Sequence, residues 1–214
     1  MADRIAPITF RLYAGRFAGT AFIISIGSGN ADGYYYAIFA TAWHVIAPIV
    51  DTQEDVALVS FDKSKRFDSK QDEIRVQQLG SAIHDTVLLL LKSRNQIIDQ
   101  AQLAPIPPWT SQLARGAEIA WLGFPGLVEA EMCFFHGHIS GYLKEPPTYL
   151  VDGVAINGVS GGPAFDNRAH LIGLVSAYLP NRIDQNTTLP GLMTLVPINT
   201  IRLFMEQNMR AKVI

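Results

Sequence analysis

Short apolar segments separated by turn residues recur along almost the whole chain, and this pattern restricts the possible folds more than any other feature. Residues 20–26 are rich in β-branched and aromatic side chains, and a glycine-rich run follows at 27–33. A second strand-like segment, 34–40, comes next, so a β-hairpin is predicted. Comparable segments occur at 56–61, 74–79, 86–91, 118–122, 132–140, 149–151, 171–177 and 193–196. Because long helices do not alternate with these strands, the sequence predicts an all-β sandwich or barrel.

Two helical segments and one linker are also predicted. Residues 42–46 are expected to turn helical briefly after the second strand of the hairpin. Apolar residues at positions 198, 201, 204 and 205 have helical spacing, which predicts a C-terminal α-helix over 198–210. The proline-rich stretch 104–110 is predicted to join two halves, 8–103 and 111–197. Residues 1–214 are therefore expected to form one domain built from two packed parts.

The most informative stretch is 157–163, which reads Asn-Gly-Val-Ser-Gly-Gly-Pro. A serine flanked by glycines can sit on a sharp turn with its hydroxyl exposed. Acyl transfer also needs amide N–H groups directed at a developing oxyanion, and the amides of Gly158 and Ser160 are suitably placed in sequence to form such an oxyanion hole. A plain turn joining two strands is the simpler interpretation of a bare Ser-Gly-Gly. The longer motif present here favours a nucleophile.

A base and an acid would have to accompany that serine. A hydroxyl attacks an amide only when an imidazole accepts its proton, and a carboxylate must then hold the imidazole. Among the five histidines, His44 follows an apolar strand within Thr-Ala-Trp-His-Val. Asp85 directly precedes the apolar stretch 86–91, which can anchor it in a core. Taken singly, His44 would be interpreted as a half-buried packing residue and Asp85 as a turn residue. Their order relative to Ser160 favours catalysis.

These motifs, in the order His, Asp, Ser, resemble the trypsin-like serine proteases, and their style is closest to the HtrA-type bacterial branch. The resemblance covers most of residues 17–200. Further stretches that carry it are Gly-Thr-Ala-Phe at 19–22, Gly-Phe-Pro at 123–125, Asp-Gly-Val-Ala-Ile-Asn at 152–157 and Gly-Leu-Val-Ser-Ala at 173–177.

The resemblance implies a fold of two packed six-stranded antiparallel β-barrels, the chymotrypsin or trypsin-like fold, followed by a C-terminal α-helix. It implies a serine endopeptidase in which Ser160 is the nucleophile, His44 the base and Asp85 the orienting acid. The HtrA-type relatives carry a peptide-binding PDZ domain after the protease, and none is expected here, because the chain ends after one predicted helix.

The resemblance also implies a pocket for P1, the substrate residue on the amino side of the cleaved bond. Its expected lining is Val154, Ser176, Ala177 and Tyr178. Since Val154 rather than an acid occupies the expected base of the pocket, small or medium apolar P1 residues are predicted in place of Lys or Arg. Asp152 lies close enough in sequence to alter this specificity if the loop takes another course.

One departure from the secreted digestive relatives concerns activation. Those proteases carry an aspartate directly before the serine, and it binds a newly cut N-terminus. Val159 occupies that place here. Activation by an N-terminal ion pair is therefore not expected, and control by loop ordering or by a restraining or recruiting protein partner is predicted.

Composition restricts the binding partners and the cellular compartment that can be expected. The net charge is -2 with no long basic run, so neither nucleic acid nor an anionic membrane is an expected partner. No secretory signal and no apolar run of about 18 residues is recognisable. Cys133 is the only cysteine, which excludes an intrachain disulfide and favours a reducing compartment. The sequence predicts a cytoplasmic protein that acts on a protein or peptide substrate.

No cofactor or metal is expected. His136 and His138 would share one face of a strand, but no third ligand lies near them in sequence. Two alternatives to a peptidase stay open: a catalytically silent peptide-binding module that keeps the fold, and an esterase that uses the same residues. The presence of all three triad residues favours the peptidase.

Overall fold

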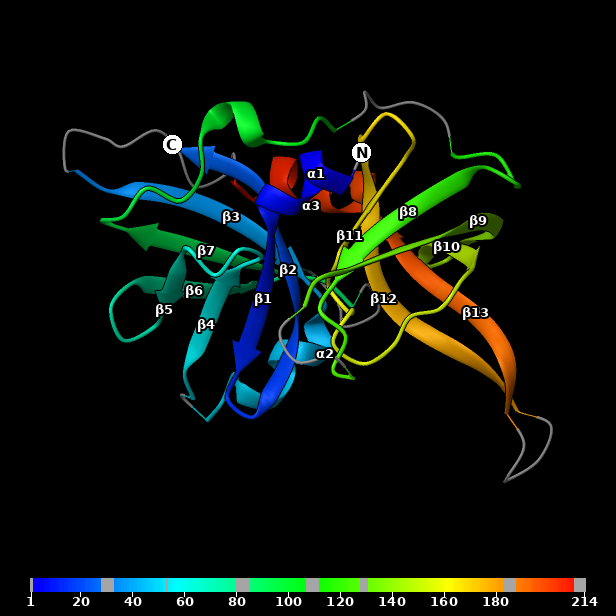
Figure 1. Cartoon of the computed structure of the whole chain (residues 1–214), viewed down its shortest axis with the longest axis horizontal. Coiled ribbons are helices and arrows are strands. Elements are labelled where there is room, and N and C mark those ends of the chain that lie inside the picture. Colours follow the sequence, from blue (N-terminus) through cyan, green and yellow to red (C-terminus); the bar gives the residue numbers. More distant parts are fainter. Residues whose placement is uncertain are drawn as a thin grey trace.

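The computed structural model describes residues 2–27, 33–52, 54–79, 85–106, 112–127, 131–182 and 188–209. Within these ranges the chain forms two β-sheets that lie beside each other, with short helices between and below them (Figure 1). The predicted all-β fold of two strand-built halves is confirmed. Four residues of the predicted linker, 107–110, lie outside the described residues.

The first half is an antiparallel sheet of seven strands in the order β5-β4-β1-β2-β3-β7-β6. The predicted hairpin is present, since β2 pairs with β3 in antiparallel register. The strands are β1 (Thr9–Ala14), β2 (Phe17–Gly27), β3 (Tyr35–Thr41), β4 (Val56–Ser60), β5 (Arg66–Asp68), β6 (Glu73–Gln78) and β7 (Val87–Ser93). This half differs in detail from the expected six-stranded barrel, because it is a seven-stranded half-barrel that ends at β5 and β6. Four of the six side chains of β6 are polar or charged and four are exposed, which suits an edge that faces water.

The second half is a closed barrel of six strands, as predicted, in the order β10-β13-β12-β11-β8-β9. Its strands are β8 (Glu118–Gly123), β9 (Cys133–Lys144), β10 (Pro147–Asp152), β11 (Pro163–Phe165), β12 (Leu171–Arg182) and β13 (Thr188–Pro197). Closure leaves this sheet without open edges, so its inward side chains form a separate core around the fully buried Trp121.

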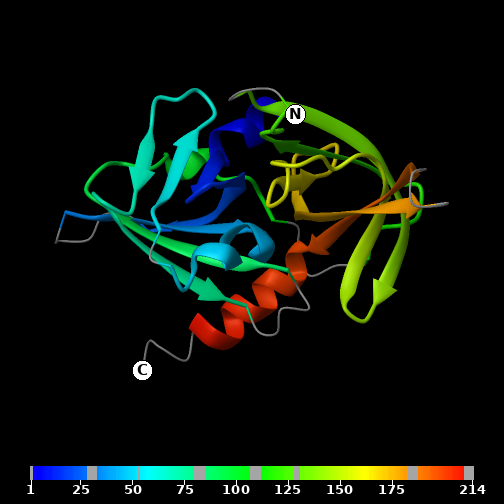
Figure 2. The same ribbon diagram turned by 90° about the horizontal axis from the view of Figure 1, so that it is seen from below.

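Helix α3 (Ile198–Met209) confirms the predicted C-terminal helix within the described residues. It leaves the barrel after β13 and extends toward the first sheet (Figure 2). Ile198 and Ile201 of this helix belong to the same buried cluster as Phe10 and Phe39 of the first sheet. The helix therefore ties the two halves together. The other helical segments are short: α1 (Ala2–Ile5), η1 (Ala6–Ile8), α2 (Trp43–Ile46), η2 (Ala47–Ile49) and η4 (Gln100–Gln102).

The larger core crosses the boundary between the halves. Phe10 and Phe39 meet edge to face with their ring centroids 5.1 Å apart, and this cluster also includes Leu122 and Phe165 of the barrel. Such shared burial fixes the position of one half against the other. No helix in the described ranges is both long enough and apolar enough to cross a bilayer.

Candidate active site

His44 and Asp85 are brought together by the pairing of β3 with β7. The two strands are antiparallel, and Thr41 at the end of β3 lies opposite Val87 at the start of β7. The chain after β3 and the chain before β7 therefore lie at the same end of this strand pair. The first carries His44 on the short helix α2, and the second carries Asp85.

The contact between these two side chains is direct. Nδ1 of His44 lies 2.9 Å from Oδ2 and 3.0 Å from Oδ1 of Asp85. The backbone N–H of His44 also donates to Oδ1 at 3.0 Å, and the N–H of Trp43 donates to the Asp85 carbonyl at 3.2 Å. Asp85 has a left-handed backbone conformation, with φ at +40°, which aspartate tolerates better than most residues. The carboxylate is thus fixed against one edge of the imidazole.

The second half of the molecule also holds this carboxylate. Ser176, on β12 and only 7% exposed, donates its hydroxyl hydrogen to Oδ2 of Asp85 at 2.5 Å. Burial alone would raise the pKa of the Asp85 carboxyl. The hydrogen bonds from His44 and Ser176 outweigh that effect, so the pKa lies below its ordinary value. Asp85 is therefore charged at neutral pH. Sequence reasoning placed Ser176 in the wall of the P1 pocket and missed this bond.

The Ser176 bond gives a pH-dependent prediction. Ser176→Ala should destabilise the protein near neutral pH by about 1.5–3 kcal/mol, the usual contribution of a hydrogen bond to a charged group. A carboxyl whose folded pKa is lowered stabilises the fold above its unfolded pKa, which is about 3.9, and this stabilisation is lost as the pH falls through the folded pKa. The difference in unfolding free energy between wild type and Ser176→Ala should therefore shrink below about pH 4. Urea unfolding over this pH range measures it, and a pH-independent difference would contradict the assignment.

Ser160 lies in the turn between β10 and β11 and is partly exposed. Its carbonyl accepts the N–H of Thr20 at 2.9 Å, and the N–H of Gly161 donates to the Val175 carbonyl at 2.7 Å. Gly161 has a φ of +86°, and a Cβ there would lie 2.1 Å from the Thr20 oxygen and 2.3 Å from Oγ1 of Thr41. Only glycine fits this contact. The serine turn therefore packs against β2 at Thr20 and against the end of β3 at Thr41. The chain that follows β3 leads into His44.

The backbone amides of the serine turn fall into two groups. Those of Val159, Gly161 and Gly162 donate to carbonyl oxygens at 3.0, 2.7 and 3.0 Å. Those of Gly158 and Ser160, the two predicted for the oxyanion hole, make no hydrogen bond to any residue that the structure describes. Donors left without a protein partner beside a serine are able to bind a developing oxyanion. The Ser160 hydroxyl likewise makes no hydrogen bond within the described ranges; catalytic hydrogen bonds are often long before substrate binds.

The residues predicted for the P1 pocket have different environments. Val154 is 53% exposed, and Ala177 is exposed, with its backbone N–H donating to Oγ1 of Thr194 at 3.0 Å. Tyr178 lies on β12, but its side chain is outside what the structure describes. Among the described residues, no cluster of His, Cys, Asp and Glu side chains is suited to a metal ion.

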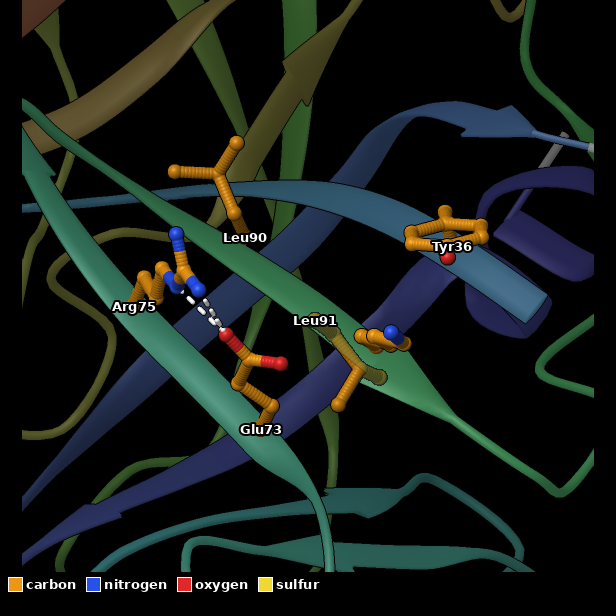
Figure 3. Close-up of a pocket in the computed structure, with 6 residues that line it drawn as sticks. Tyr36, Glu73, Arg75, Leu90 and Leu91 are labelled. Atoms are coloured by element: carbon orange, nitrogen blue, oxygen red, sulfur yellow. Dashed lines mark hydrogen bonds and ion pairs between the residues drawn. The ribbon is translucent and has the colours of Figure 1, made fainter. Parts of the chain in front are cut away.

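A hollow elsewhere on the molecule is lined by other residues than those predicted for the catalytic triad and the P1 pocket. It lies between β3, β6 and β7 and has a volume of about 280 Å³. An ion pair between Arg75 and Glu73 spans part of it, with Tyr36 on the other side (Figure 3). None of the predicted catalytic residues lines this hollow.

Comparison with known proteins gives a consistent result. The family model for the trypsin-like peptidase domain matches residues 19–174. The crystal structure of the serine endoprotease from Yersinia pestis is similar with a TM-score of 0.68 and 19% sequence identity, over 98% of this chain and 65% of that chain. The inactive form of a mutant of Rv3671c from M. tuberculosis is similar with a TM-score of 0.70 and 15% identity, over 100% of this chain and 92% of that chain.

At such identities the two structures establish the fold. This chain spans 65% of the length of the Yersinia protein, and no curated protein sequence matches it. The family match extends over most of the 214 residues, and it includes the histidine, aspartate and serine motifs. The predicted trypsin-like fold and the resemblance on which it rested are confirmed, and the protein belongs to the family of trypsin-like peptidase domains.

Proposed function

We propose that this protein is a serine endopeptidase that cleaves peptide bonds through an acyl-enzyme intermediate on Ser160. The observation that carries the proposal is the contact of His44 Nδ1 with the Asp85 carboxylate at 2.9 Å, formed beside a serine turn whose Gly158 and Ser160 amides have no partner among the described residues. A base, an acid and two oxyanion donors are the groups that acyl transfer to a serine requires.

Each group has a defined step. With the Nδ1 hydrogen donated to Asp85, the lone pair of His44 Nε2 is available to take the Ser160 hydroxyl proton while Oγ attacks the peptide carbonyl carbon. The carbonyl oxygen then becomes an oxyanion that accepts hydrogen bonds from the Gly158 and Ser160 amides. Collapse of this intermediate breaks the C–N bond, and His44 passes its proton to the leaving amine. Water repeats the sequence on the acyl-enzyme, releasing the acid product and restoring Ser160.

A preference for small or medium apolar P1 residues has structural support. Trp121 is fully buried and packs in the second core with Val159 and Val175, which directly precede Ser160 and Ser176. A Cβ at Gly153 would lie 2.4 Å from the indole ring, so the indole packs against the backbone that leads into Val154. The apolar side chain of Val154 supplies no negative charge to attract Lys or Arg.

Cleavage of a peptide library should therefore show P1 Ala and Val ahead of Lys and Arg. Each missing or extra methylene in such a pocket typically changes kcat/KM by about 10- to 200-fold. Mass-spectrometric mapping of cleavage sites, with the Ser160→Ala protein as the background sample, measures the preference. Predominant cleavage after Lys or Arg would show that an acidic group, such as Asp152, reaches the pocket.

Reaction with a fluorophosphonate probe tests the proposed function without knowledge of the natural substrate. The probe phosphorus bonds to an activated serine oxygen and expels fluoride, so it reports on the nucleophile, the base and the oxyanion donors together. We expect stoichiometric labelling of the native protein, located on Ser160 by peptide mass spectrometry, and loss of labelling after heat denaturation. A native wild-type protein that stays unlabelled would instead favour a catalytically silent peptide-binding module.

A further inference from the structure

Thr20 on β2 forms a polar junction between three distant parts of the chain. It is fully buried. Its hydroxyl donates to the Gly158 carbonyl at 2.8 Å and accepts the N–H of Phe124 at 3.1 Å. Phe124 follows β8, and Gly158 precedes the nucleophile. A single side-chain oxygen thus joins the first sheet to the barrel and to the serine turn.

The backbone of Thr20 makes two further contacts in the same place. Its N–H donates to the Ser160 carbonyl at 2.9 Å. Its carbonyl accepts the hydroxyl hydrogen of Thr41 at 2.7 Å, three residues before His44. Every polar group of Thr20 is therefore hydrogen-bonded, and three of its four bonds lead to the serine turn or to the strand that precedes His44.

The hydroxyl bond fixes one particular peptide unit, the one that joins Gly158 to Val159. Thr20 holds its carbonyl oxygen, and its N–H donates to the Ile156 carbonyl at 3.0 Å. The two amides of the proposed oxyanion hole, on Gly158 and Ser160, lie one residue to either side of that unit in the chain. Displacing this unit would move both amides, because each belongs to a peptide unit directly joined to it.

Gly158 cannot hold this orientation unaided. Its φ of +94° lies in the region that glycine enters freely, and glycine has more alternative backbone conformations than any other residue. External hydrogen bonds select one of them: the bond from the Thr20 hydroxyl to the Gly158 carbonyl and a bond from the Gly126 N–H to the Asn157 carbonyl at 2.7 Å. Electrostatic stabilisation of an oxyanion depends on donors that are aligned before the reaction begins.

We propose that Thr20 is a positioning residue of the active site, whose hydroxyl keeps the Gly158 and Ser160 amides aligned to receive the oxyanion. The inference rests on the proposed peptidase function and adds to it a buried residue of the other half of the fold. Thr20 contacts no substrate atom in this role, because it acts through the peptide unit between Gly158 and Val159.

The test is the Thr20→Val variant, which keeps the shape of the side chain and removes the hydroxyl. The second-order rate of fluorophosphonate labelling should fall by about 10- to 100-fold, somewhat less than for outright loss of an oxyanion donor. For peptide hydrolysis the loss should appear in kcat with KM nearly unchanged, since the oxyanion exists only beyond the ground state. Thr20→Ser, which keeps the hydroxyl, should restore most of the rate.

Thr9→Val is the matched control. Thr9 is also fully buried on a strand of the first sheet, and its hydroxyl donates to the Ile5 carbonyl at 2.9 Å. The same atoms are lost there from a site that contacts no proposed catalytic group, so its labelling rate should stay near that of wild type. Unfolding midpoints of both valine variants separate a loss of stability from a loss of alignment. Should Thr20→Val fail to fold, Thr20→Cys, with its small and weakly donating thiol, takes its place.

The outcomes are distinct. A Thr20 variant that is folded and slow, with Thr9→Val fast and Thr20→Ser restored, supports the inference. A folded Thr20→Val or Thr20→Cys protein that labels as fast as Thr9→Val overturns the inference and leaves the proposed function intact. A wild-type protein that does not label at all overturns both.

Discussion

Ser160→Ala is expected to lower kcat for peptide hydrolysis by about 10⁵- to 10⁶-fold, the scale at which a serine protease loses its nucleophile. The substitution removes the only oxygen that forms the acyl-enzyme, while the Gly158 and Ser160 amides stay in place. Some acceleration over the uncatalysed reaction should therefore persist, because oxyanion donors and substrate binding still act. Hydrolysis of a fluorogenic peptide chosen from the cleavage profile measures the loss.

This prediction separates catalysis from folding with little ambiguity. Ser160 is partly exposed, and within the described ranges its hydroxyl makes no hydrogen bond, so the stability of Ser160→Ala should stay within about 0.5 kcal/mol of wild type. Ser64→Ala is the matched control, because Ser64 is an exposed serine whose hydroxyl bonds to Asp62 in a distant turn. It should keep full activity. A Ser160→Ala protein that retains a tenth or more of the wild-type rate would exclude Ser160 as the nucleophile.

Asp85→Asn should lower kcat by about 10⁴-fold, the loss known for replacing the buried aspartate of a Ser-His-Asp triad. The carboxylate accepts hydrogen bonds from the His44 ring, the His44 backbone and Ser176. An asparagine amide can donate to Nδ1 of His44, which places the ring hydrogen on Nε2. The base is then unable to take the Ser160 proton. Steady-state kinetics should show the loss mainly in kcat, and fluorophosphonate labelling should slow in parallel.

Asp62→Asn provides the comparison for this second variant. Asp62 also accepts hydrogen bonds from serine side chains, Ser60 and Ser64, and its pKa is also lowered by them. It lies in the turn between β4 and β5, away from His44, so its replacement should leave kcat unchanged. If Asp85→Asn lowers kcat by less than about tenfold, a loss typical of a residue with only a packing role, then the carboxylate does not orient the base.

Most strands were predictable because they depend on local patterns, whereas the closed second barrel was predicted from the family resemblance. Apolar segments of strand length bounded by turn residues predicted ten of the strands, and the C-terminal helix follows from its apolar spacing. The sequence analysis did not predict β1, β5 and β11, of which β5 and β11 are only three residues long. His44 and Asp85 lie in contact, and their catalytic roles stay predictions for the variants above. The number of strands in the first sheet was harder to predict, because the sequence of β6 does not determine whether another strand pairs with its outer edge.

Side-chain direction near the pocket could not be read from the sequence. The pairing of β12 with β13 shifts register between Val175 and Tyr178. Such an irregularity breaks the simple alternation of side chains between the two faces of a strand. Ser176 directs its hydroxyl to Asp85, and its assignment to the pocket wall stays a prediction. The hydrogen bonds of the Thr20 hydroxyl were equally unpredictable, because its partners lie 104 and 138 residues away along the chain.

Asp85 contacts His44 in its own half of the molecule and Ser176 in the other half. This arrangement has a consequence for when the proposed activity can arise. His44 and Asp85 belong to the first sheet, whereas Ser160 and Ser176 lie on the barrel. Chains fold from the N-terminal side as they leave the ribosome. A nascent chain that has folded only its first sheet would hold the proposed base and acid but not the proposed nucleophile, so on the proposed function it could not cleave its neighbours or itself. The proposed activity would arise only after the barrel strands are made, when the barrel closes and docks.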